Sequence, residues 1–496
     1  MSENLLLWLL ITPLVISLLA FAARLLGRRA HLVLEGLHVI GITLVLVFAL
    51  GVVQAVLVHQ NVQALNQWLY ADHLGAIFVL IIGILGFLNG LYSIGYMRHD
   101  LRTGEVDLNK LSTYYGFYHL FLFTMLMAVT SNNLILMWVA VEATTLGSAF
   151  LVGLYGHKSS LEAVWKYVLI CTVGVAFALY GTILVYSNAF NVLHSAESAM
   201  LWTEVIKSGS LLDPMIMNLA FVFVLIGFGT KAGLFPMHAW LPDAHSEAPS
   251  PISALLSGVL LKCALFVIIR YYLITAQSTG TALPQLLFLV FGVLSIAVAA
   301  LFIFAQRDIK RLLAYSSVEN IGLIVVGLGL GGVGIFAALL HTINHSIVKS
   351  LMFCTSGNVL IKYKTRDLGA IKGLLKVAPV STFLLMGGAL ALGGVPPFNI
   401  FVSELWTMAA GVERGSVWLM AAVLLFLVIV FAAFLRLISG SVFGPAPAGA
   451  VKGDVHWFTL LPIGLLLVLM ILLGVYMPAP LYELLKGATQ IVSLGN

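Results

Sequence analysis

The chain has 496 residues, of which 61% are hydrophobic and 9% are charged, and its mean hydropathy is +1.07. Soluble domains are about 45–50% apolar and about 25% charged, so this composition excludes a soluble protein and indicates one that crosses a membrane many times. The net charge of +5 does not indicate nucleic-acid binding, because the basic residues lie mostly in loops between apolar segments. The 3 cysteines are scattered without metal-ligand spacing, and we expect no metal site and no cofactor.

Apolar segments of about 20 residues predict transmembrane helices. We count fourteen, two of them interrupted. The first is preceded by Met-Ser-Glu-Asn, which carries no positive charge, so we expect an uncleaved membrane helix and not a secretory signal. The predicted spans are 4–26, 32–57, 74–97, 113–130, 133–155, 163–188, 214–241, 251–275, 285–306, 311–331, 333–361, 378–410, 416–440 and 457–477.

The two interrupted spans, 214–241 and 378–410, organise the expected fold. Pro236 interrupts the first and Pro396–Pro397 the second, because proline removes a backbone donor and breaks a helix. The spans are five apart and therefore enter the membrane from opposite sides, as inverted repeats do. We expect an all-α integral membrane protein of about 14 transmembrane helices. Its expected parts are helices 1–3 (1–110), a first five-helix repeat (111–276), a second five-helix repeat (277–442) and a C-terminal helix 14 (443–496).

Basic residues are distributed asymmetrically between the loops. If both termini lie outside, 17 of the 25 Lys and Arg residues fall on the cytoplasmic side and 4 on the other. Positive charges accumulate on the cytoplasmic side of membrane proteins. The sequence therefore predicts a multi-pass protein of the bacterial inner membrane with both termini in the periplasm.

Several spans carry ionisable residues, which lipid tolerates poorly. A lysine near the bilayer centre costs about 2.5–3.5 kcal/mol on insertion scales, so Lys231 and Lys262 are functional candidates by default. Glu142 lies about nine residues into its span and is that span's only charge. We expect Glu142 to pair with Lys231 and to control whether this lysine holds a proton. The alternative is a carboxylate that only bonds to neighbouring helices.

His341, His345 and Lys349 follow one another at four-residue spacing, which places them on one helix face. Two imidazoles leading to an amine suit a proton relay, because histidine titrates near neutral pH. The alternatives are a metal site, which would need more ligands, and a structural polar stripe. Glu404 lies seven residues beyond Pro397 and is the acidic end of the series.

Five further residues are secondary candidates. His238 and His245 lie in the short polar turn after the first interruption. Glu162 and Lys166 are four residues apart at the start of a span, where an ordinary interfacial ion pair is equally expected. Glu319, which we place at the opening of the span 311–331, is ambiguous in the same way.

Three segments carry a resemblance to a known family. They are KAGLFPMHAWLPDAHSEAPSPISALLSGVLLK, QRDIKRLLAYSSVENIG and HTINHSIVKSLMF. They resemble the proton-translocating antiporter-like subunits of respiratory complex I, membrane-bound hydrogenases and multisubunit cation/proton antiporters. In finer detail, HLFLFTMLMAVTSNNLILMWVAVEATTLGSAFLVGLYG is similar to the hydrogenase-4 component F group, which is associated with formate hydrogenlyase.

The resemblance implies a proton path along the middle of the membrane, with no redox cofactor in this chain. It also implies two kinds of partner. The first is further antiporter-like membrane subunits, and the second is a peripheral redox arm that contains iron–sulfur subunits and could contain nickel–iron subunits. Some relatives have lysine where this chain has Glu404, which places it nearer the middle-type subunits. About twenty residues follow the last span, too few for the long lateral helix of a distal subunit. The path residues would be Glu142, Lys231, Lys262, His341, His345, Lys349 and Glu404.

Two rival functions remain open. The chain could be a subunit of a cation/proton antiporter or of an inorganic-carbon uptake complex, driven by an ion gradient. It could also be a structural membrane anchor that moves nothing. Redox partners in the purified complex would favour the redox-driven proton relay. Na⁺- or bicarbonate-dependent flux would favour the gradient-driven subunit.

Overall fold

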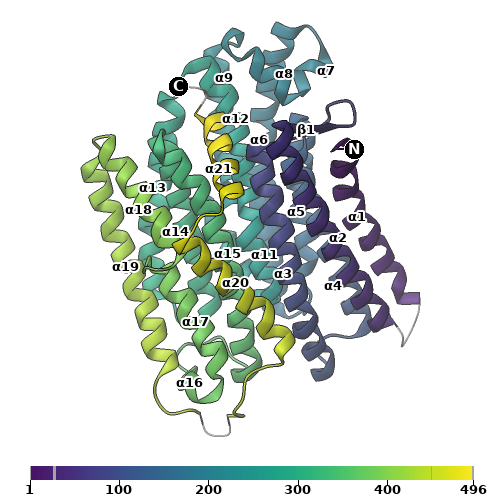
Figure 1. Ribbon diagram of the computed structural model, residues 1–496, viewed down its shortest axis with the longest axis vertical. Helices are drawn as coiled ribbons and strands as arrows, with labels where there is room; N and C mark the ends of the chain where they lie inside the picture. The colour runs from purple at the N-terminus through teal and green to yellow at the C-terminus, as the bar shows by residue number, and fades with distance from the viewer. Residues whose placement is uncertain (1, 26–29, 448–449, 494–496) are drawn as a thin grey trace.

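The computed structural model describes residues 2–25, 30–447 and 450–493. It is a bundle of long helices whose axes lie roughly along one line, with consecutive helices running up and down (Figure 1). The 17 basic residues assigned to the cytoplasmic side include Arg28 and Arg29, which lie outside the described residues. The first half contains α1 (Ser2–Ala22), α2 (Ala30–His59), β1 (Asn61–Ala64), β2 (Leu69–Asp72), α3 (His73–Thr103), α4 (Leu108–Thr130), α5 (Leu134–Val152), α6 (Lys158–Leu193), α7 (Ala196–Met200), α8 (Trp202–Lys207), η2 (Gly209–Leu211), α9 (Pro214–Ala232), η3 (Met237–Trp240) and α10 (Leu241–Glu247).

The second half begins with one long span made of three pieces, α11, η4 and α12. The elements are α11 (Ser250–Leu255), η4 (Leu256–Leu260), α12 (Leu261–Thr279), α13 (Ala282–Ala305), α14 (Ile309–Leu330), α15 (Val333–Tyr363), α16 (Leu374–Val377), α17 (Pro379–Leu392), α18 (Asn399–Glu413), α19 (Val417–Val442), α20 (Trp457–Val475) and α21 (Ala479–Val492).

The predicted all-α membrane architecture is confirmed. Eleven helical segments in the described ranges are long and apolar enough to cross a membrane. Every predicted span coincides with a helix or an interrupted pair of helices, but α4, α15 and the pair α17–α18 are not among those eleven. The exact number of fourteen therefore stays a prediction.

Several elements were not predicted. Strands β1 and β2 pair antiparallel, with Asn61 opposite Asp72, between α2 and α3. In the described residues of the predicted C-terminal part, 443–496, a second helix, α21, follows α20 and packs against α3 and α15. At 14 residues, α21 is too short for a search based on a membrane-spanning length.

Both predicted interruptions are confirmed. Helix α9 ends at Gly233, whose φ of +84° is left-handed, and α17 is followed by Gly394 with φ +68°. Such values favour glycine, which has no Cβ to clash with the backbone. Cis peptide bonds precede Pro236 and Pro397, beyond which the chain continues as α10 and α18. The proposed inversion between the two halves stays a prediction.

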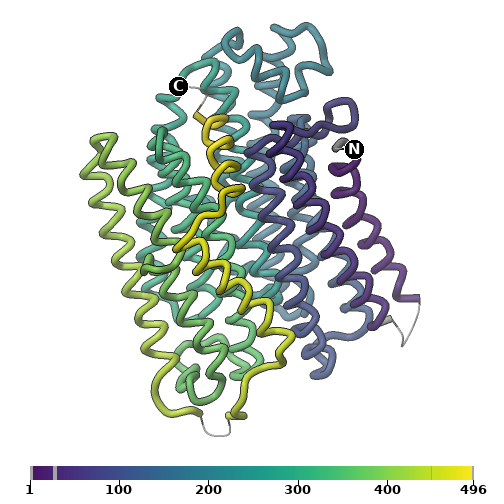
Figure 2. The backbone as a smooth tube through the Cα atoms, viewed as in Figure 1, coloured from purple at the N-terminus to yellow at the C-terminus, as the bar shows by residue number. Residues whose placement is uncertain are grey.

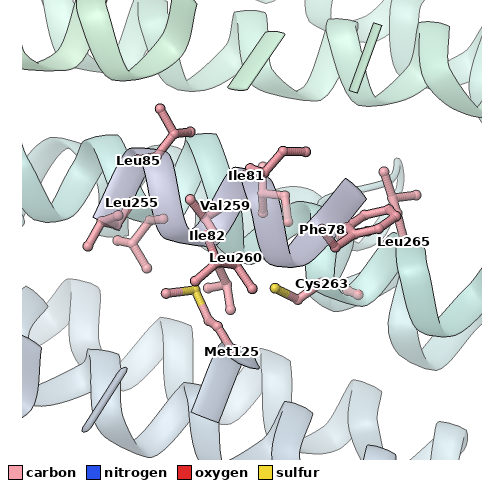
Figure 3. Close-up of a cluster of buried hydrophobic side chains, with 14 of the residues drawn as sticks. Phe78, Ile81, Ile82, Leu85, Met125, Leu255, Val259, Leu260, Cys263 and Leu265 are labelled. Carbon is pink, nitrogen blue, oxygen red and sulfur yellow. The ribbon is translucent and has the colours of Figure 1, made fainter. Parts of the chain in front are cut away.

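The centre of the bundle is the span α11–η4–α12, which neighbouring helices enclose completely. Figure 3 shows Phe78 and Ile82 of α3 packed with Met125 of α4 against Val259 and Cys263. Outer helices such as α6 and α19 instead expose large apolar side chains, as lipid-facing helices do. The apolar interior therefore isolates whatever polar groups the central helices carry.

The beginning of α1 and the end of α21 lie toward the same end of the bundle, where α7 and α8 also lie (Figure 2). The side of the membrane on which the termini lie stays a prediction.

Candidate functional site

Four lysines of the described residues are buried, and three of them are the predicted path residues. The fourth, Lys310, lies in the first turn of α14 and donates to the carbonyl of Ala248. Lys231 on α9, Lys262 on α12 and Lys349 on α15 are each at most 1% exposed. Within the described ranges, none of the three lies within ion-pair distance of a carboxylate. Burying an ammonium without a counter-ion is costly, so these lysines depend on neutral hydrogen-bond acceptors.

The neighbours of Lys231 are hydroxyl groups. Its Nζ donates to Thr145 Oγ1 and to Tyr167 OH, both at 2.7 Å. Ser148 Oγ lies 2.7 Å from the same tyrosine oxygen and continues the network along α5. The Nζ also lies 4.7 Å from the Tyr167 ring and 5.9 Å from the ring of Trp240, where cation–π attraction adds to the hydrogen bonds.

Glu142 does not pair directly with Lys231, so this prediction was wrong for the arrangement seen here. Glu142 is half-buried on α5, and its Oε1 accepts a hydrogen bond of 2.9 Å from Thr172 Oγ1 of α6. Its Oε2 is buried without a partner in the protein. Thr145 lies one turn beyond Glu142 on α5, and its hydroxyl takes the position on the ammonium that we expected the carboxylate to take.

Lys262 is held by a distortion of its own span. Residues Leu256–Leu260 form a π-helical segment, and Nζ of Lys262 donates to the carbonyl of Ser257 at 2.5 Å. A π-bulge frees carbonyl groups from the regular helical ladder and is frequent at functional sites. Ser257 Oγ in turn lies 2.7 Å from Ser317 Oγ, which connects this span to α14.

Lys349 also bonds to α14, through the carbonyl of Leu313 at 2.7 Å and the hydroxyl of Ser316. Glu319 lies one turn further along the same helix and is 1% exposed. We placed Glu319 at the opening of its span, but it lies in the middle of α14, next to Asn320. This buried carboxyl group therefore belongs with the central lysines and not with the surface charges.

His341 and His345 are stacked on one face of α15 as predicted, with ring centroids 6.2 Å apart. His341 bridges two helices, because one ring nitrogen lies 3.0 Å from Asn320 Oδ1 and the other 2.9 Å from Ser403 Oγ. His345 is fully buried, and both of its ring nitrogens lack a partner in the protein. Buried polar atoms are normally paired with protein or ordered water, so we expect water at His345.

Glu404 on α18 is half-buried and is set by the second interruption. A Cβ atom on Gly394 would lie only 2.2 Å from Glu404 Oε2. The glycine therefore gives the carboxylate room to lie against the broken backbone. Ser403, the chain neighbour of Glu404, bonds to His341, so Glu404 and the histidines share one end of the buried series.

Of the two histidines in the polar turn, only His245 joins the buried series. It is fully buried, with one ring nitrogen 2.9 Å from the Leu241 carbonyl and the other unpartnered. Its ring lies 6.1 Å from that of Trp240, which also faces Lys231. His238 instead packs against Tyr315 and Phe235 nearer the surface.

Glu162 and Lys166 form the ordinary ion pair that was the alternative interpretation. Lys166 Nζ lies 2.6 Å from Glu162 and 3.1 Å from Asp243 of α10, and Arg311 bonds to the same aspartate. The pair is exposed at the rim of a 300 Å³ cavity next to α10. It is a surface feature above the buried series and not part of it.

Sequence reasoning missed two buried polar clusters. His38 on α2 lies 3.0 Å from His119 on α4, and both are fully buried. Arg270 on α12 is buried and makes two hydrogen bonds of 2.7 and 2.8 Å to Asp72. Each of these residues lies in or beside an apolar segment, and a systematic search for lone ionisable residues would have found them.

Burial raises the pKa of the Asp72 carboxyl group, but the charge and hydrogen bonds of Arg270 lower this pKa by a larger amount. The net result is a pKa below the ordinary value of an aspartate. This pair therefore stays ionised and is structural, unlike the unpaired lysines.

Taken together, the buried ionisable groups run from α5 and α9 through α12, α14 and α15 to α18. Lys231 bonds to hydroxyls of α5 and α6, Lys349 bonds to α14, and His341 bonds to α14 and α18. Lys262 bonds to the Ser257 carbonyl of its own span, and the Ser257 hydroxyl meets Ser317 of α14. Such a series can pass protons if water bridges the remaining gaps, because every titratable member can gain and lose a proton.

Comparison with known proteins identifies the family. Residues 131–430 match the model described as "NADH:quinone oxidoreductase/Mrp antiporter, TM", and residues 63–104 match "NADH-Ubiquinone oxidoreductase (complex I), chain 5 N-terminus". The hydrogenase-4 component F homolog of Methylacidiphilum infernorum is 39% identical over 351 residues, which are 71% of this chain and 74% of that protein.

Two further proteins agree. Hydrogenase-4 component B of Escherichia coli is 33% identical over 68% of this chain, which spans about half (50%) of that longer protein. A chain of the membrane-bound sulfane sulfur reductase, described as an archaeal respiratory membrane complex, superposes with a TM-score of 0.87 at 25% identity and covers 98% of this chain and 97% of that chain. The chain thus belongs to the antiporter-like membrane subunits of the complex I, hydrogenase and Mrp superfamily.

Proposed function

We propose that this chain relays protons along its buried series of ionisable residues, as one subunit of a multisubunit redox-driven complex of the hydrogenase-4 or complex I type. The pathway residues are Glu142, Lys231, Lys262, Glu319, His341, His345, Lys349 and Glu404, with His245 beside them.

The observation that carries this proposal is the burial of three lysines without counter-ions. A fold that only anchored other subunits would replace them with apolar residues, because each buried ammonium costs free energy. Their partners are neutral hydroxyls and carbonyls, which can hold either the ammonium or the amine. Retention of all three is expected only where the proton is gained and lost.

We further propose that Lys231 exchanges between two positions. In the structure Lys231 donates to Thr145 and Tyr167. Glu142, which lies on α5 together with Thr145, has one carboxylate oxygen without a partner. Redox chemistry in a partner subunit would favour movement of the ammonium toward the carboxylate. The return movement would release the proton to the next site on the path.

The expected partners are other membrane subunits, including further antiporter-like chains, and a peripheral arm with iron–sulfur and nickel–iron subunits. The relatives named above are components of multisubunit complexes, which supports membrane partners. The expected location is the bacterial inner membrane, with both termini on the periplasmic side.

The test is proton translocation by the assembled complex in proteoliposomes. We expect Lys231→Gln to preserve electron transfer into the complex at low proton-motive force while it lowers the number of protons moved per electron. Lys207→Gln on α8 is the matched control, because Lys207 is an exposed lysine paired with Glu204. An unchanged proton-to-electron ratio in Lys231→Gln would refute the proposal.

The family description also includes Mrp antiporters, so exchange of a cation for a proton is a second candidate. It predicts Na⁺-dependent proton flux in the absence of an electron donor, and no redox subunits in the gently purified complex. An inorganic-carbon uptake complex would instead show bicarbonate-dependent flux.

A further inference from the structure

A basic cavity is lined by the last turns of α3, the end of α15 and the start of α20, three segments that are far apart in the sequence. Figure 1 shows where these helices lie in the bundle. The cavity has a volume of about 340 Å³. It is remote from the buried lysines, and the proposed proton relay does not use it.

Four cations and no carboxylate line this cavity. Arg98 is neutralised from outside, because it makes two hydrogen bonds of 2.8 and 2.7 Å to Glu35. Arg102, Lys362 and Lys364 take part in no ion pair with the described residues. All three line the same cavity as His99, so their charges converge on one space. The cavity therefore holds three uncompensated positive charges.

The simplest structural explanation is that these residues stabilise helix ends. Arg102 and Lys362 lie in the last turns of α3 and α15, where a cation interacts favourably with the helix dipole by about 0.3–1 kcal/mol. That effect does not require the side chains to meet, and mutual repulsion would drive them apart. Lys364, beyond the end of α15, adds a third charge to the same cavity. An anion between them explains the convergence.

The other part of the lining is apolar and aromatic. Ile361, Val455 and Phe458 face the cavity, and the neighbouring Trp457 is 56% exposed. Exposed tryptophan at the end of a membrane helix is typical of the headgroup level of a bilayer. A ligand that fits this cavity carries negative charge beside an apolar portion.

We propose that this cavity binds the phosphodiester headgroup of an anionic phospholipid. The phosphate lies among Arg102, Lys362 and Lys364, and the start of the acyl chains packs against Phe458 and Val455. Basic pockets between transmembrane helices recognise acidic lipid headgroups in this way. The bound lipid connects the start of α20 to the ends of α3 and α15, so the contact between these helices depends on lipid composition.

The test uses the full-length chain in its assembled complex, stripped of lipid in detergent. Phosphatidylglycerol or phosphatidylcholine is then titrated, and bound lipid is counted by native mass spectrometry. The variant Arg102→Gln/Lys362→Gln/Lys364→Gln is compared with a matched control that removes three exposed lysines elsewhere, Lys158→Gln/Lys372→Gln/Lys376→Gln.

Wild type and control should bind phosphatidylglycerol equally and in preference to phosphatidylcholine. The cavity variant should bind it about a hundredfold more weakly, since each cation near an anionic lipid contributes about a fivefold factor. If the triple variant fails to fold, Lys364→Gln alone should show about a fivefold loss.

Three results would overturn the proposal. The first is equal phosphatidylglycerol binding by the cavity variant and the control. The second is displacement of the lipid by millimolar inorganic phosphate, which would identify a site for a free anion. The third is binding that appears only after partner subunits are removed, which would mean that a protein surface covers the cavity.

Discussion

The ion pair between Asp72 and Arg270 allows the stability of the bundle to be tested quantitatively. Asp72 precedes α3 and Arg270 lies on α12, so the pair joins two segments almost two hundred residues apart. Asp72 is 3% exposed and Arg270 is 1% exposed. We consider the substitution Asp72→Asn, which keeps the size of the side chain and removes its charge.

The expected loss follows from two estimates that agree. Each hydrogen bond to a charged group contributes about 1.5–3 kcal/mol, and this pair has two. Removing one partner of a buried ion pair generally costs about 3–5 kcal/mol, because the other charge is left uncompensated. We therefore expect Asp72→Asn to lower the free energy of unfolding by about 3–5 kcal/mol. Arg270→Met should cost more, because it also removes the guanidinium stacked 4.1 Å from the Trp202 ring.

The assay is equilibrium unfolding in mixed detergent micelles, followed by tryptophan fluorescence. The pKa of Asp72 is lowered by folding, so its contribution is complete above about pH 4 and is lost as the pH falls through its folded pKa. The difference between wild type and Asp72→Asn should therefore shrink at lower pH. Glu204→Gln, which breaks the exposed pair with Lys207, should cost at most about 0.5 kcal/mol. A cost below 1 kcal/mol for Asp72→Asn at pH 7 would refute the reasoning.

Four glycine substitutions form two matched pairs, one that tests the site and one that tests helix packing. Gly394→Ala should reduce the number of protons moved per electron severalfold, because a Cβ at φ +68° would press on Glu404. Its control is Gly440→Ala on α19, whose Cβ would meet no atom within 4 Å and which should leave this ratio unchanged. Gly227→Ala should destabilise the chain by about 1–3 kcal/mol, since its Cβ would lie 2.3 Å from a backbone nitrogen of α6. Gly464→Ala in α20 has open space around its Cβ and should stabilise the folded chain by up to about 1 kcal/mol. Equal effects of the substitutions at positions 227 and 464 in a thermal unfolding assay would contradict the packing argument.

Membrane physics explains how much of this fold the sequence could predict. Apolar length located the helices, and the prolines at positions 236 and 396–397 located both interruptions, because these signals are local. The β1–β2 hairpin and α21 were not predicted, because neither has a membrane-spanning length. The partners of Arg270 and His38 were not predicted either, because each lies on a distant segment that only the fold brings near.

The candidate site divides in the same way. The residue types and the helix-face spacing of His341, His345 and Lys349 could be predicted, because they depend on one helix alone. The acceptors of each lysine could not, because Thr145, Ser257 and the Leu313 carbonyl are ordinary residues without a sequence signal. The wrong prediction, a direct pair between Glu142 and Lys231, came from matching charges without knowing which hydroxyls lie between them.

The absence of that direct pair favours a relay over a fixed ion pair. Two unit charges 4 Å apart attract by about 4 kcal/mol at the effective dielectric constant of a partly hydrated interior. A permanent pair of Glu142 with Lys231 would tie the proton to the lysine by that amount. Hydroxyl groups hold the lysine more weakly, because they accept from the ammonium and can also donate to the amine. In the proposed relay, Glu142, with one oxygen unpartnered, would be the second position of the lysine, and movement between the two would be the step that a redox partner drives.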